Sequence, residues 1–428
     1  MHPAVYSRAA MGRTLARLGL SGREALLLGT AIALAVVVRL ASLALTDGHA
    51  LAGDQLEYDL QGRLFADGLA WWSTTPFGEL HPSLWKAPLY TAWVGLWYWL
   101  LGPDPQLVMG VQALAVTPVT VSLTFALARR LFGAGAAVAA AFLVAVYPLA
   151  WQFEVRLYSE ALAVPLGLAV LLLVLERRPT RRTVVTTGVL VGLAILVRPS
   201  SGFLLAGVLV AWIAAAGWRR GAALTAATVA VAALCVAPWT IRNAVVDGGF
   251  VPVSVQSGAL YCTFNELSAT SEDFPYACRI RTPAAERLLR TPTSDSEFQE
   301  NLQQLAFDYI AENPASVPQA FFWNGIVRLW DLRDPSLALV EVPFEGRSVG
   351  ATQLGLLMYY PLLGLALVAL WRHRARRALV LPVLALALAA SIVYTGASGT
   401  RYRAPLEPLI VVLACSTPFV ARSARRLT

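Results

Sequence analysis

The chain has 428 residues, of which 57% are hydrophobic and only 14% are charged, and its mean hydropathy is +0.59. A soluble globule of this size needs more polar residues to cover its surface, so the composition indicates a polytopic membrane protein. The formal net charge is +8, but the arginines fall in short clusters beside apolar runs. Such clusters record orientation in a membrane, so we expect no nucleic-acid-binding groove.

The chain begins with a basic segment that precedes its first apolar run. Four arginines lie between residues 8 and 23, and an apolar run follows from about 25 to 45. As a helix, this run is long enough to cross about 30 Å of hydrocarbon. Arg39 lies inside it and no small-residue cleavage site closes it, so we expect an uncleaved signal anchor. Further apolar runs lie near residues 106–128, 134–150, 161–175, 183–197, 200–217, 221–240, 351–371, 378–395 and 404–420.

The segment Pro88–Leu101 decides the predicted topology. It is short and heavily aromatic, which is typical of a segment in the membrane interface. If it does not span, every other arginine cluster falls on the cytoplasmic side, as the positive-inside rule requires. We therefore predict an all-α membrane protein of about ten spans with both termini in the cytoplasm.

This topology divides the chain into five parts. Residues 1–45 are the cytoplasmic N-terminus and first span, and residues 46–105 are a first periplasmic loop with interfacial helices. Residues 106–240 hold spans two to seven, 241–350 a long extracytoplasmic loop, and 351–428 the last three spans. Within the long loop, helical patterns lie near 295–312 and 315–331, the second after the helix-starting "NPAS".

Two of the four cysteines, Cys262 and Cys278, fall in the long outer loop. An oxidising compartment would permit a disulfide between them, worth about 3 kcal/mol by chain-entropy arguments. Two unpaired thiols are the alternative, because spacing alone does not prove a bridge. Cys235 and Cys415 lie in apolar runs and are expected to be small buried hydrophobic residues.

Charged residues gather at the predicted outer ends of the spans. Each costs about 2.5–3.5 kcal/mol at a helix centre, so charges near membrane depth tend to mark function, although any single one can be an interfacial anchor. They are Asp54, Glu57, Lys86, Glu154, Arg156, Glu160, Arg198, Arg242, Arg401 and Arg403. Lys86 is the only lysine among 34 basic residues.

Together these charges suit the transfer of a group from a membrane-embedded phosphate carrier to a hydroxyl outside the membrane. Arginine and lysine hold a leaving phosphate, the first as a bidentate fork and the second as a point charge. A carboxylate accepts the proton of the attacking hydroxyl. Because the phosphate leaves as a stabilised anion, charge neutralisation replaces a general acid.

At these residues the sequence resembles the GT-C glycosyltransferases, in the lipid-carrier-dependent branch that includes protein O-mannosyltransferases and the lipid A aminoarabinose transferase. The blocks that carry the resemblance are "GDQLEYDLQGRLFADG", "WKAPLYTAWVGLWYWLLG", "ARRLFG", "YPLAWQFEVRLYSEALAVPL", "GLAILVRPSSG", "APWTIRNAVVDGGFVPVSVQSG" and "RYRAPLEPLI". The resemblance implies a GT-C-like helical bundle in the bacterial cytoplasmic membrane, with an extracytoplasmic active site. It also implies an inverting transfer of a sugar from polyprenyl phosphate to an acceptor hydroxyl.

The resemblance also assigns roles to individual residues. It makes Asp54 the catalytic base and gives Glu160 a role in orienting the acceptor or a metal. The residues implied to bind the lipid phosphate or the sugar are Lys86, Arg198, Arg401, Arg242, Tyr402 and Tyr58.

The sequence departs from the family pattern at two positions. Gln55 stands where the family has an acid, and Trp85 replaces the acid before the lysine. A metal site built from position 85 is therefore not expected, and the use of a divalent metal elsewhere is left open.

Two other functions stay open beside the enzyme. One is a transporter or flippase for lipid-linked sugars, although the paired halves common in transporters are not evident in the sequence. The other is a catalytically inactive scaffold, because of Gln55. The acceptor, whether a glycan, a lipid or a protein, is expected to bind largely to residues 241–350.

Overall fold

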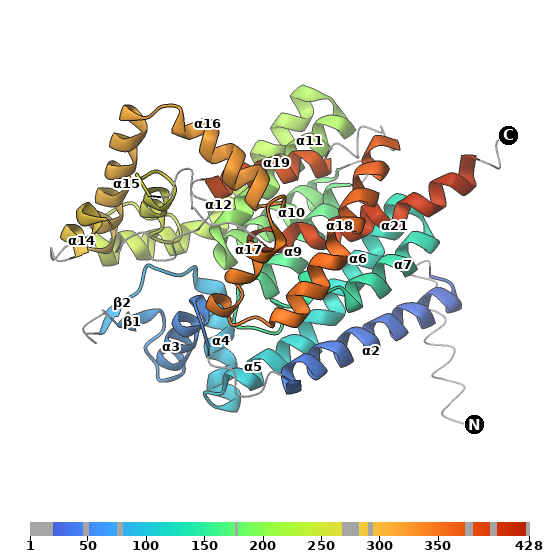
Figure 1. Ribbon diagram of the computed structural model, residues 1–428, viewed down its shortest axis with the longest axis horizontal. Helices are drawn as coiled ribbons and strands as arrows, with labels where there is room; N and C mark the ends of the chain where they lie inside the picture. Colours follow the sequence, from blue (N-terminus) through green and yellow to red (C-terminus); the bar gives the residue numbers. More distant parts are fainter. Residues whose placement is uncertain are drawn as a thin grey trace.

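The structure is a computed structural model that describes residues 20–45, 51–74, 80–175, 179–267, 282–289, 294–372, 380–393 and 400–424. Apart from one short hairpin, the regular elements of this part of the chain are helices (Figure 1). The hairpin pairs β1 (Trp72–Thr74) with β2 (Leu80–Pro82) in antiparallel register, with Ser73 opposite His81. The predicted all-α class is confirmed.

The α-helices follow one another along most of the described chain. The first half of the chain contains α2 (Gly22–Leu45), α3 (Asp54–Ala66), α4 (Pro88–Leu101), α5 (Pro105–Val111), α6 (Thr117–Phe132), α7 (Ala134–Val146), α8 (Pro148–Trp151), α9 (Glu160–Val174), α10 (Arg181–Val197), α11 (Leu204–Ala216) and α12 (Trp218–Asp247). The second half contains α14 (Pro283–Leu289), α15 (Asp295–Glu312), α16 (Ser316–Ala320), α17 (Pro335–Val340), α18 (Val349–Arg372), α19 (Val380–Val393), α20 (Thr400–Arg403) and α21 (Glu407–Ala424). Short 3₁₀ and π segments are η1 (Gln112–Val116), η2 (Pro199–Phe203), η3 (Ser257–Cys262), η4 (Phe321–Arg328), η5 (Pro343–Glu345) and η6 (Ala404–Leu406).

Five helical stretches of the described chain are long and apolar enough to cross a membrane. They are α2, Pro105–Phe132, Pro199–Ala216, α12 and α18, and two shorter apolar helices are α7 and α9. Each of the ten predicted apolar runs coincides with a helix, and the number that spans stays a prediction. At 14 residues, α4 is about 21 Å long, shorter than the hydrocarbon core.

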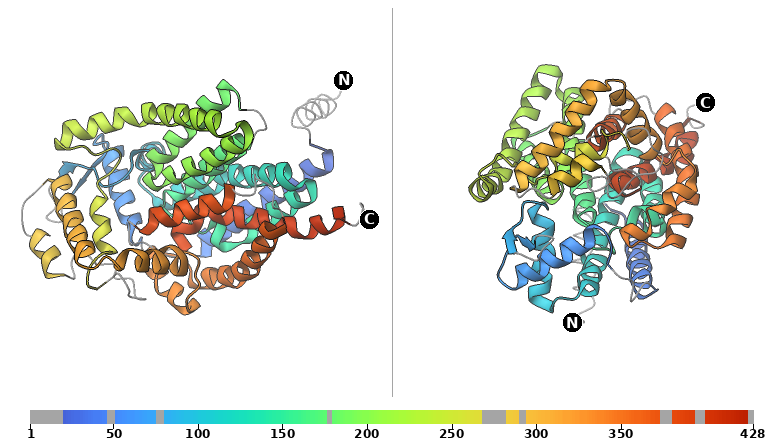
Figure 2. Two further views of the ribbon diagram at one scale, coloured as in Figure 1. Left: turned by 90° about the horizontal axis from the view of Figure 1, so that it is seen from above. Right: turned by 60° about the vertical axis from the view of Figure 1, so that its left-hand side comes forward.

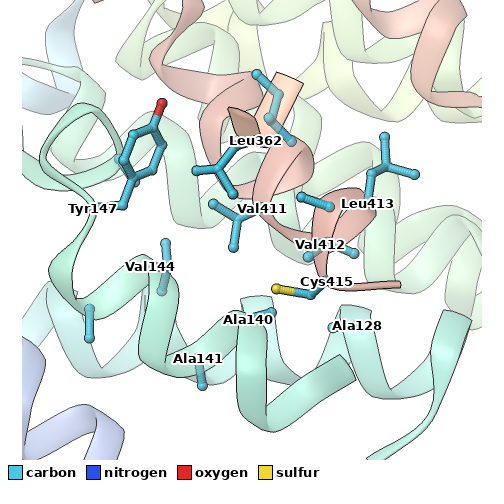
Figure 3. Close-up of a cluster of buried hydrophobic side chains, with 14 of the residues drawn as sticks. Ala128, Ala140, Ala141, Val144, Tyr147, Leu362, Val411, Val412, Leu413 and Cys415 are labelled. Atoms are coloured by element: carbon cyan, nitrogen blue, oxygen red, sulfur yellow. The ribbon is translucent and has the colours of Figure 1, made fainter. Parts of the chain in front are cut away.

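The largest core lies between α2, α6, α7, α18 and α21. Alanines 137, 140 and 141 of α7 are fully buried, and their small side chains let α21 approach closely (Figure 3). Cys415 of α21 is buried in this cluster and free, and Cys235 is also free. Close packing of small residues thus fixes where α21, and α20 before it, enter the bundle.

The predicted outer segments gather at one end of the molecule. The elements α3, β1 and β2 of the first loop lie at the same end as α14 and α15, and the start of α2 and the end of α21 lie at the opposite end (Figures 1 and 2). The helices predicted near 295–312 and 315–331 are confirmed as α15 and as α16 with η4. Ser294 caps α15 by accepting the N–H of Glu297.

Cys262, at the end of η3, is disulfide-bonded. Its predicted partner Cys278 lies outside the described residues. The pairing of Cys262 with Cys278 therefore stays a prediction.

Candidate active site

Asp54 opens α3 and forms two ion pairs with residues from distant segments. Its Oδ1 atom lies 2.6 Å from Lys86 Nζ, just before α4, and its Oδ2 atom lies 2.7 Å from Arg401 Nη2 in α20. Gly53, the N-cap of α3, has a φ of 58°, a left-handed conformation that favours glycine. The order Gly-Asp thus turns the carboxylate into the site at a helix N-terminus, where negative charge is favoured.

Glu160 opens α9 and binds two arginines. Its Oε1 atom accepts Arg401 Nε at 2.7 Å and also pairs with Arg198 Nη1. The Glu160 side chain is only 1% exposed, whereas the Asp54 side chain is 37% exposed. Arg401 therefore bridges a buried carboxylate and an accessible one.

The two carboxylates and three cations predicted from the sequence thus meet in one place. Arg198 ends α10, where Pro199 stops the helix and starts η2. Lys86 precedes Ala87, and Pro88 at the first position of α4 fixes the start of that helix. Two proline boundaries therefore hold two of the cations at helix ends.

The neighbouring cations lower the pKa of the Asp54 carboxyl. Burial by itself would raise the pKa of the Asp54 carboxyl, but the charges of Lys86 and Arg401 outweigh burial and hold this pKa well below its usual range. The pKa of the Tyr58 hydroxyl is raised by its own burial and by the charge of Asp54. In the state described, Asp54 is therefore ionised but weakly basic, and Tyr58 is neutral.

Aromatic rings lie against each cation. Lys86 Nζ is 5.2 Å from the centroid of Tyr58, and Arg198 Cζ is 4.9 Å from that of Tyr402. Arg401 Cζ lies 4.2 Å from the ring of Tyr158. These rings stabilise the cations and limit their orientations without neutralising their charge.

These residues line a cavity of about 400 Å³. Asp54, Tyr58, Lys86, Arg198, Arg401 and Tyr402 lie in its wall with Trp85, Ala87, Ser159, Val197, Pro199, Ser200, Ser254, Gln256, Ala259 and Cys262. The last four belong to the long outer loop, which therefore supplies one wall. The cavity has the size and mixed lining of a small-molecule site.

An apolar groove of about 570 Å³ begins beside this cavity. It lies between α4, η1, α6, α9 and α10, and Val197 lines both the groove and the cavity. The other groove residues are Leu89, Ala92, Trp93, Leu96, Ala115, Val116, Val119, Leu123, Leu162, Pro165, Leu166, Ala169 and Leu193. The charged 400 Å³ cavity, which we call the head cavity, and the apolar groove are thus adjacent.

A second polar cavity of about 600 Å³ lies on the other side of Trp85, which lines both cavities. Its wall includes Glu57 and His81 from the first outer loop, and Asp247 and Asp295 from the long loop. Burial, together with Asp247 and Glu57 nearby, raises the pKa of Asp295, although His81 opposes this.

Four charged residues singled out in the sequence lie elsewhere. Arg242 is not among the residues that line the 400 Å³ cavity; its guanidinium donates to the carbonyls of Ser83 and Trp71. It therefore holds the hairpin of the first loop against α12.

Of the other three, Arg156 donates to the carbonyl of Gly346, and Glu154 and Arg403 form ion pairs within the described bundle. Glu154 pairs at 3.0 Å with Arg39, the arginine inside the first span. Arg403 pairs with Glu407 at 2.6 Å and with Asp331 at 2.8 Å. Arg39 and Arg403 are fully buried, which explains why each has a carboxylate partner.

Gln55 also has a structural environment. Its Nε2 atom donates to the carbonyl of Glu345 at 2.9 Å, and its Oε1 atom accepts the N–H of Leu157 at 3.4 Å. An ionised glutamate has no N–H and would not make the first of these bonds. The departure from the family pattern at this position therefore fits the local structure.

The residues at the site do not fit a metal ion. Both carboxylates are already paired with cations, and Lys86 and Arg401 would repel a divalent ion. The described segments contain no group of three or more His, Cys, Asp or Glu side chains that could hold one. We therefore derive no step that uses a metal.

Comparison with known proteins identifies the fold. The family described as dolichyl-phosphate-mannose-protein mannosyltransferase matches residues 85–241. The archaeal oligosaccharyltransferase AglB from Archaeoglobus fulgidus, in complex with an inhibitory peptide and a dolichol-phosphate, aligns with 95% of this chain at 14% identity and a TM-score of 0.53. The chain has a GT-C fold. It is an all-α polytopic membrane protein.

Two further solved structures align with most of this chain. The Archaeoglobus fulgidus oligosaccharyltransferase complexed with Zn and sulfate covers 94% of this chain at 15% identity and a TM-score of 0.55. The chain spans about half the length of these oligosaccharyltransferases, 52% and 50%. ArnT from Cupriavidus metallidurans, bound to undecaprenyl phosphate, covers 92% of this chain and 78% of its own at 18% identity and a TM-score of 0.40. No curated protein sequence matches the chain.

Three residues in or beside the site were not predicted from the sequence: Tyr158, whose ring lies against Arg401, and the cavity residues Ser254 and Gln256. Tyr158 lies two residues before Glu160 in a block already singled out, and Ser254 and Gln256 lie in the long loop. An aromatic residue next to a charged block was the only available signal for Tyr158. Ser254 and Gln256 lie in the block "APWTIRNAVVDGGFVPVSVQSG", to which the resemblance assigned no role beyond Arg242.

Proposed function

We propose that the protein is a membrane glycosyltransferase that moves a sugar from a polyprenyl-phosphate carrier to an acceptor hydroxyl on the outer side of the membrane. The observation that carries the proposal is an accessible carboxylate, Asp54, held between Lys86 and Arg401 in a cavity beside an apolar groove. This combination suits a donor with an anionic head and a long apolar tail. The GT-C fold supports the same assignment.

The groove is the proposed site of the polyprenyl chain. Its described lining residues are all apolar, and it lies between α4, η1, α6, α9 and α10. Val197 lines both spaces, so a chain in the groove would deliver its phosphate to the adjoining cavity. There Lys86, Arg198 and Arg401 are the cations that would bind the phosphate oxygens.

The ion pairs of Asp54 suggest how the base becomes active. A donor phosphate would compete with Asp54 for Lys86 and Arg401. Losing these partners raises the pKa of the Asp54 carboxyl toward its usual range, because the charges that lowered it now face the phosphate. Donor binding therefore makes Asp54 a better base, and we propose that the donor binds before the acceptor reacts.

The chemical step then follows from the positions of these groups. Asp54 accepts the proton of the acceptor hydroxyl, whose oxygen forms a bond to the anomeric carbon. The bond from that carbon to the phosphate oxygen breaks from the opposite face, which inverts the anomeric centre. The polyprenyl phosphate leaves with the bonding electron pair, and the three cations neutralise its charge. Glu160 orients Arg198 and Arg401 for this role.

The acceptor is proposed to approach from the long-loop side. Ser254 and Gln256 line the head cavity there, and the second polar cavity opens on the other side of Trp85. Glycan, lipid and protein acceptors all present hydroxyls that such a surface can bind.

The experiment is a transfer assay with the detergent-purified full chain. Synthetic polyprenyl-phosphate donors carrying labelled mannose, glucose, galactose or aminoarabinose are incubated with an envelope extract as the acceptor mixture. The proposal predicts labelled product from at least one donor and release of polyprenyl phosphate. Movement of intact donor across vesicle membranes without cleavage would instead identify a lipid transporter. If the protein neither transfers the sugar nor moves the donor, it is an inactive scaffold.

A further inference from the structure

We infer that residues 344–346 of the long outer loop position Asp54 against Arg401, and that Gln55 and Tyr158 are the positioning residues through which this segment acts. The inference rests on the proposed function, since it concerns the same carboxylate. Its positioning residues are not among the cations that are proposed to bind the phosphate. Residues 344–346 form a short segment that we call the loop clamp.

The backbone carbonyl of Glu345 binds one residue next to Asp54 and one residue next to Arg401. The carbonyl oxygen of Glu345 accepts Gln55 Nε2 at 2.9 Å and the hydroxyl of Tyr158 at 3.0 Å. Gln55 follows Asp54 directly in α3, and the ring of Tyr158 lies 4.2 Å from Arg401 Cζ. A displacement of this carbonyl therefore moves the supports of the carboxylate and of its guanidinium partner together.

Two further contacts fix the loop clamp in place. Arg156 Nε donates to the carbonyl of Gly346 at 2.7 Å. A Cβ atom at Gly53 would lie 2.6 Å from the carbonyl oxygen of Phe344, so the loop backbone packs directly on the N-cap of α3. The first turn of α3 therefore cannot shift without displacing the loop clamp.

The loop clamp is itself anchored on its C-terminal side. Arg347 Nε pairs with Glu345 Oε2 at 2.5 Å, and Arg347 Nη1 donates to Thr352 in α18 at 3.2 Å. Thr352 in turn donates to Gln152, in the segment that leads to Tyr158. Hydrogen bonds thus tie the loop clamp to α3, to the segment before α9 and, through Arg347, to α18.

Gln55 is suited to this role because an amide both donates and accepts. It is 1% exposed, and it joins the Glu345 carbonyl to the N–H of Leu157. A misplacement of about 1 Å in a reacting group can reduce a rate about 100-fold. Loss of the amide is therefore expected to lower kcat more than donor affinity.

The first test measures the coupling without any transfer. Hydrogen exchange is compared by mass spectrometry in the full-chain wild type, Gln55→Leu and a matched control, Gln61→Leu. Gln61 is an equally buried glutamine on α3 whose amide donates to Glu57 and Ser83. Gln55→Leu should speed exchange in peptides covering residues 344–347 as well as α3, and Gln61→Leu should not affect 344–347. Unchanged exchange at 344–347 in Gln55→Leu overturns the inference.

The second test uses kinetics with whichever donor of the series is turned over. Gln55→Leu and the milder Tyr158→Phe should each lower kcat, by about 10- to 100-fold for Gln55→Leu, with KM for the donor little changed. Because both bonds end on the Glu345 carbonyl, the double variant should lose less than the product of the single losses. Losses that multiply, or that appear only in KM, contradict positioning.

A conservative variant adds a pH readout. In Gln55→Glu a protonated side chain can donate to the Glu345 carbonyl, but an ionised one cannot. The ratio of its kcat to that of wild type should therefore rise as pH falls, whereas a ratio independent of pH argues for a purely structural role. If the wild type turns over no donor, the proposed function fails, and the exchange experiment still decides the loop clamp.

Discussion

Lys86 has a defined place in the site. Its side chain is 5% exposed, and its Nζ atom contacts Asp54 and the face of Tyr58. Replacement by alanine should weaken binding of polyprenyl phosphate by about 1.5–3 kcal/mol, as for a lost charged hydrogen bond. Arg63→Ala is the control, because it removes one positive charge from the exposed side of α3, where Arg63 pairs with Asp59. Equal affinities for the lipid in both variants would remove Lys86 from the phosphate site.

Glu341 of the long loop is predicted to make stability depend on pH. Its carboxylate accepts Arg333 at 2.8 Å, but burial and then the charge of Glu345 raise its pKa to about 7. The folded state thus holds this proton more tightly than the unfolded state, whose carboxyl has an ordinary pKa. Stability should therefore fall as pH rises through the interval between the ordinary value and about 7.

The variant Glu341→Gln should remove this dependence. We expect it to be more stable than wild type at pH 8, by on the order of 2 kcal/mol, and nearly equal to it at pH 4. Melting temperatures in detergent across this range check the prediction. Parallel pH curves for the two proteins would show that Glu341 titrates normally.

The helices α3 and α4 form the unit that sets the distance from Asp54 to Lys86. They cross closely because each has a glycine at the contact: a Cβ at Gly62 would lie 2.6 Å from Val94, and one at Gly95 would collide with the ring of Phe65. Small residues at such crossings let helix backbones approach.

Alanine at Gly95 tests this contact. Gly95→Ala should destabilise the protein by about 1–3 kcal/mol through overpacking and should also slow transfer. Gly110→Ala in α5 is the matched control, because no atom lies within 4 Å of the added Cβ. Thermal melts that are the same for Gly95→Ala and wild type would show that α3 and α4 can separate at little cost.

Hydrophobic runs and motif blocks predicted much of this architecture. Membrane helices need long apolar segments, and charged residues near membrane depth are costly, so they tend to mark function. The helices, and the meeting of Asp54, Lys86, Glu160, Arg198 and Arg401, follow from such patterns. Arg242 looks the same in sequence, yet its partners are backbone carbonyls of the first loop. Carbonyl acceptors leave no side-chain pattern, which is also why the role of Gln55 was not predicted.

The molecule as a whole places three spaces next to one another. An apolar groove, a charged head cavity and a second polar cavity are adjacent through Val197 and Trp85. This order suits a lipid tail, a phosphate-linked sugar and an acceptor in turn. Asp54 contacts the cations and is also accessible from the cavity. A substitution at Asp54 should therefore affect binding of the lipid phosphate and catalysis differently.

The variant Asp54→Asn measures this separation most directly. Removing the carboxylate charge frees Lys86 and Arg401, so the purified variant should bind polyprenyl phosphate more tightly than wild type, by about tenfold or 1.4 kcal/mol. Without its base, the same protein should transfer sugar about 10²- to 10⁴-fold more slowly. Both quantities are measured on one preparation, with lipid binding as the control for folding. Turnover equal to wild type in Asp54→Asn would contradict the proposed mechanism.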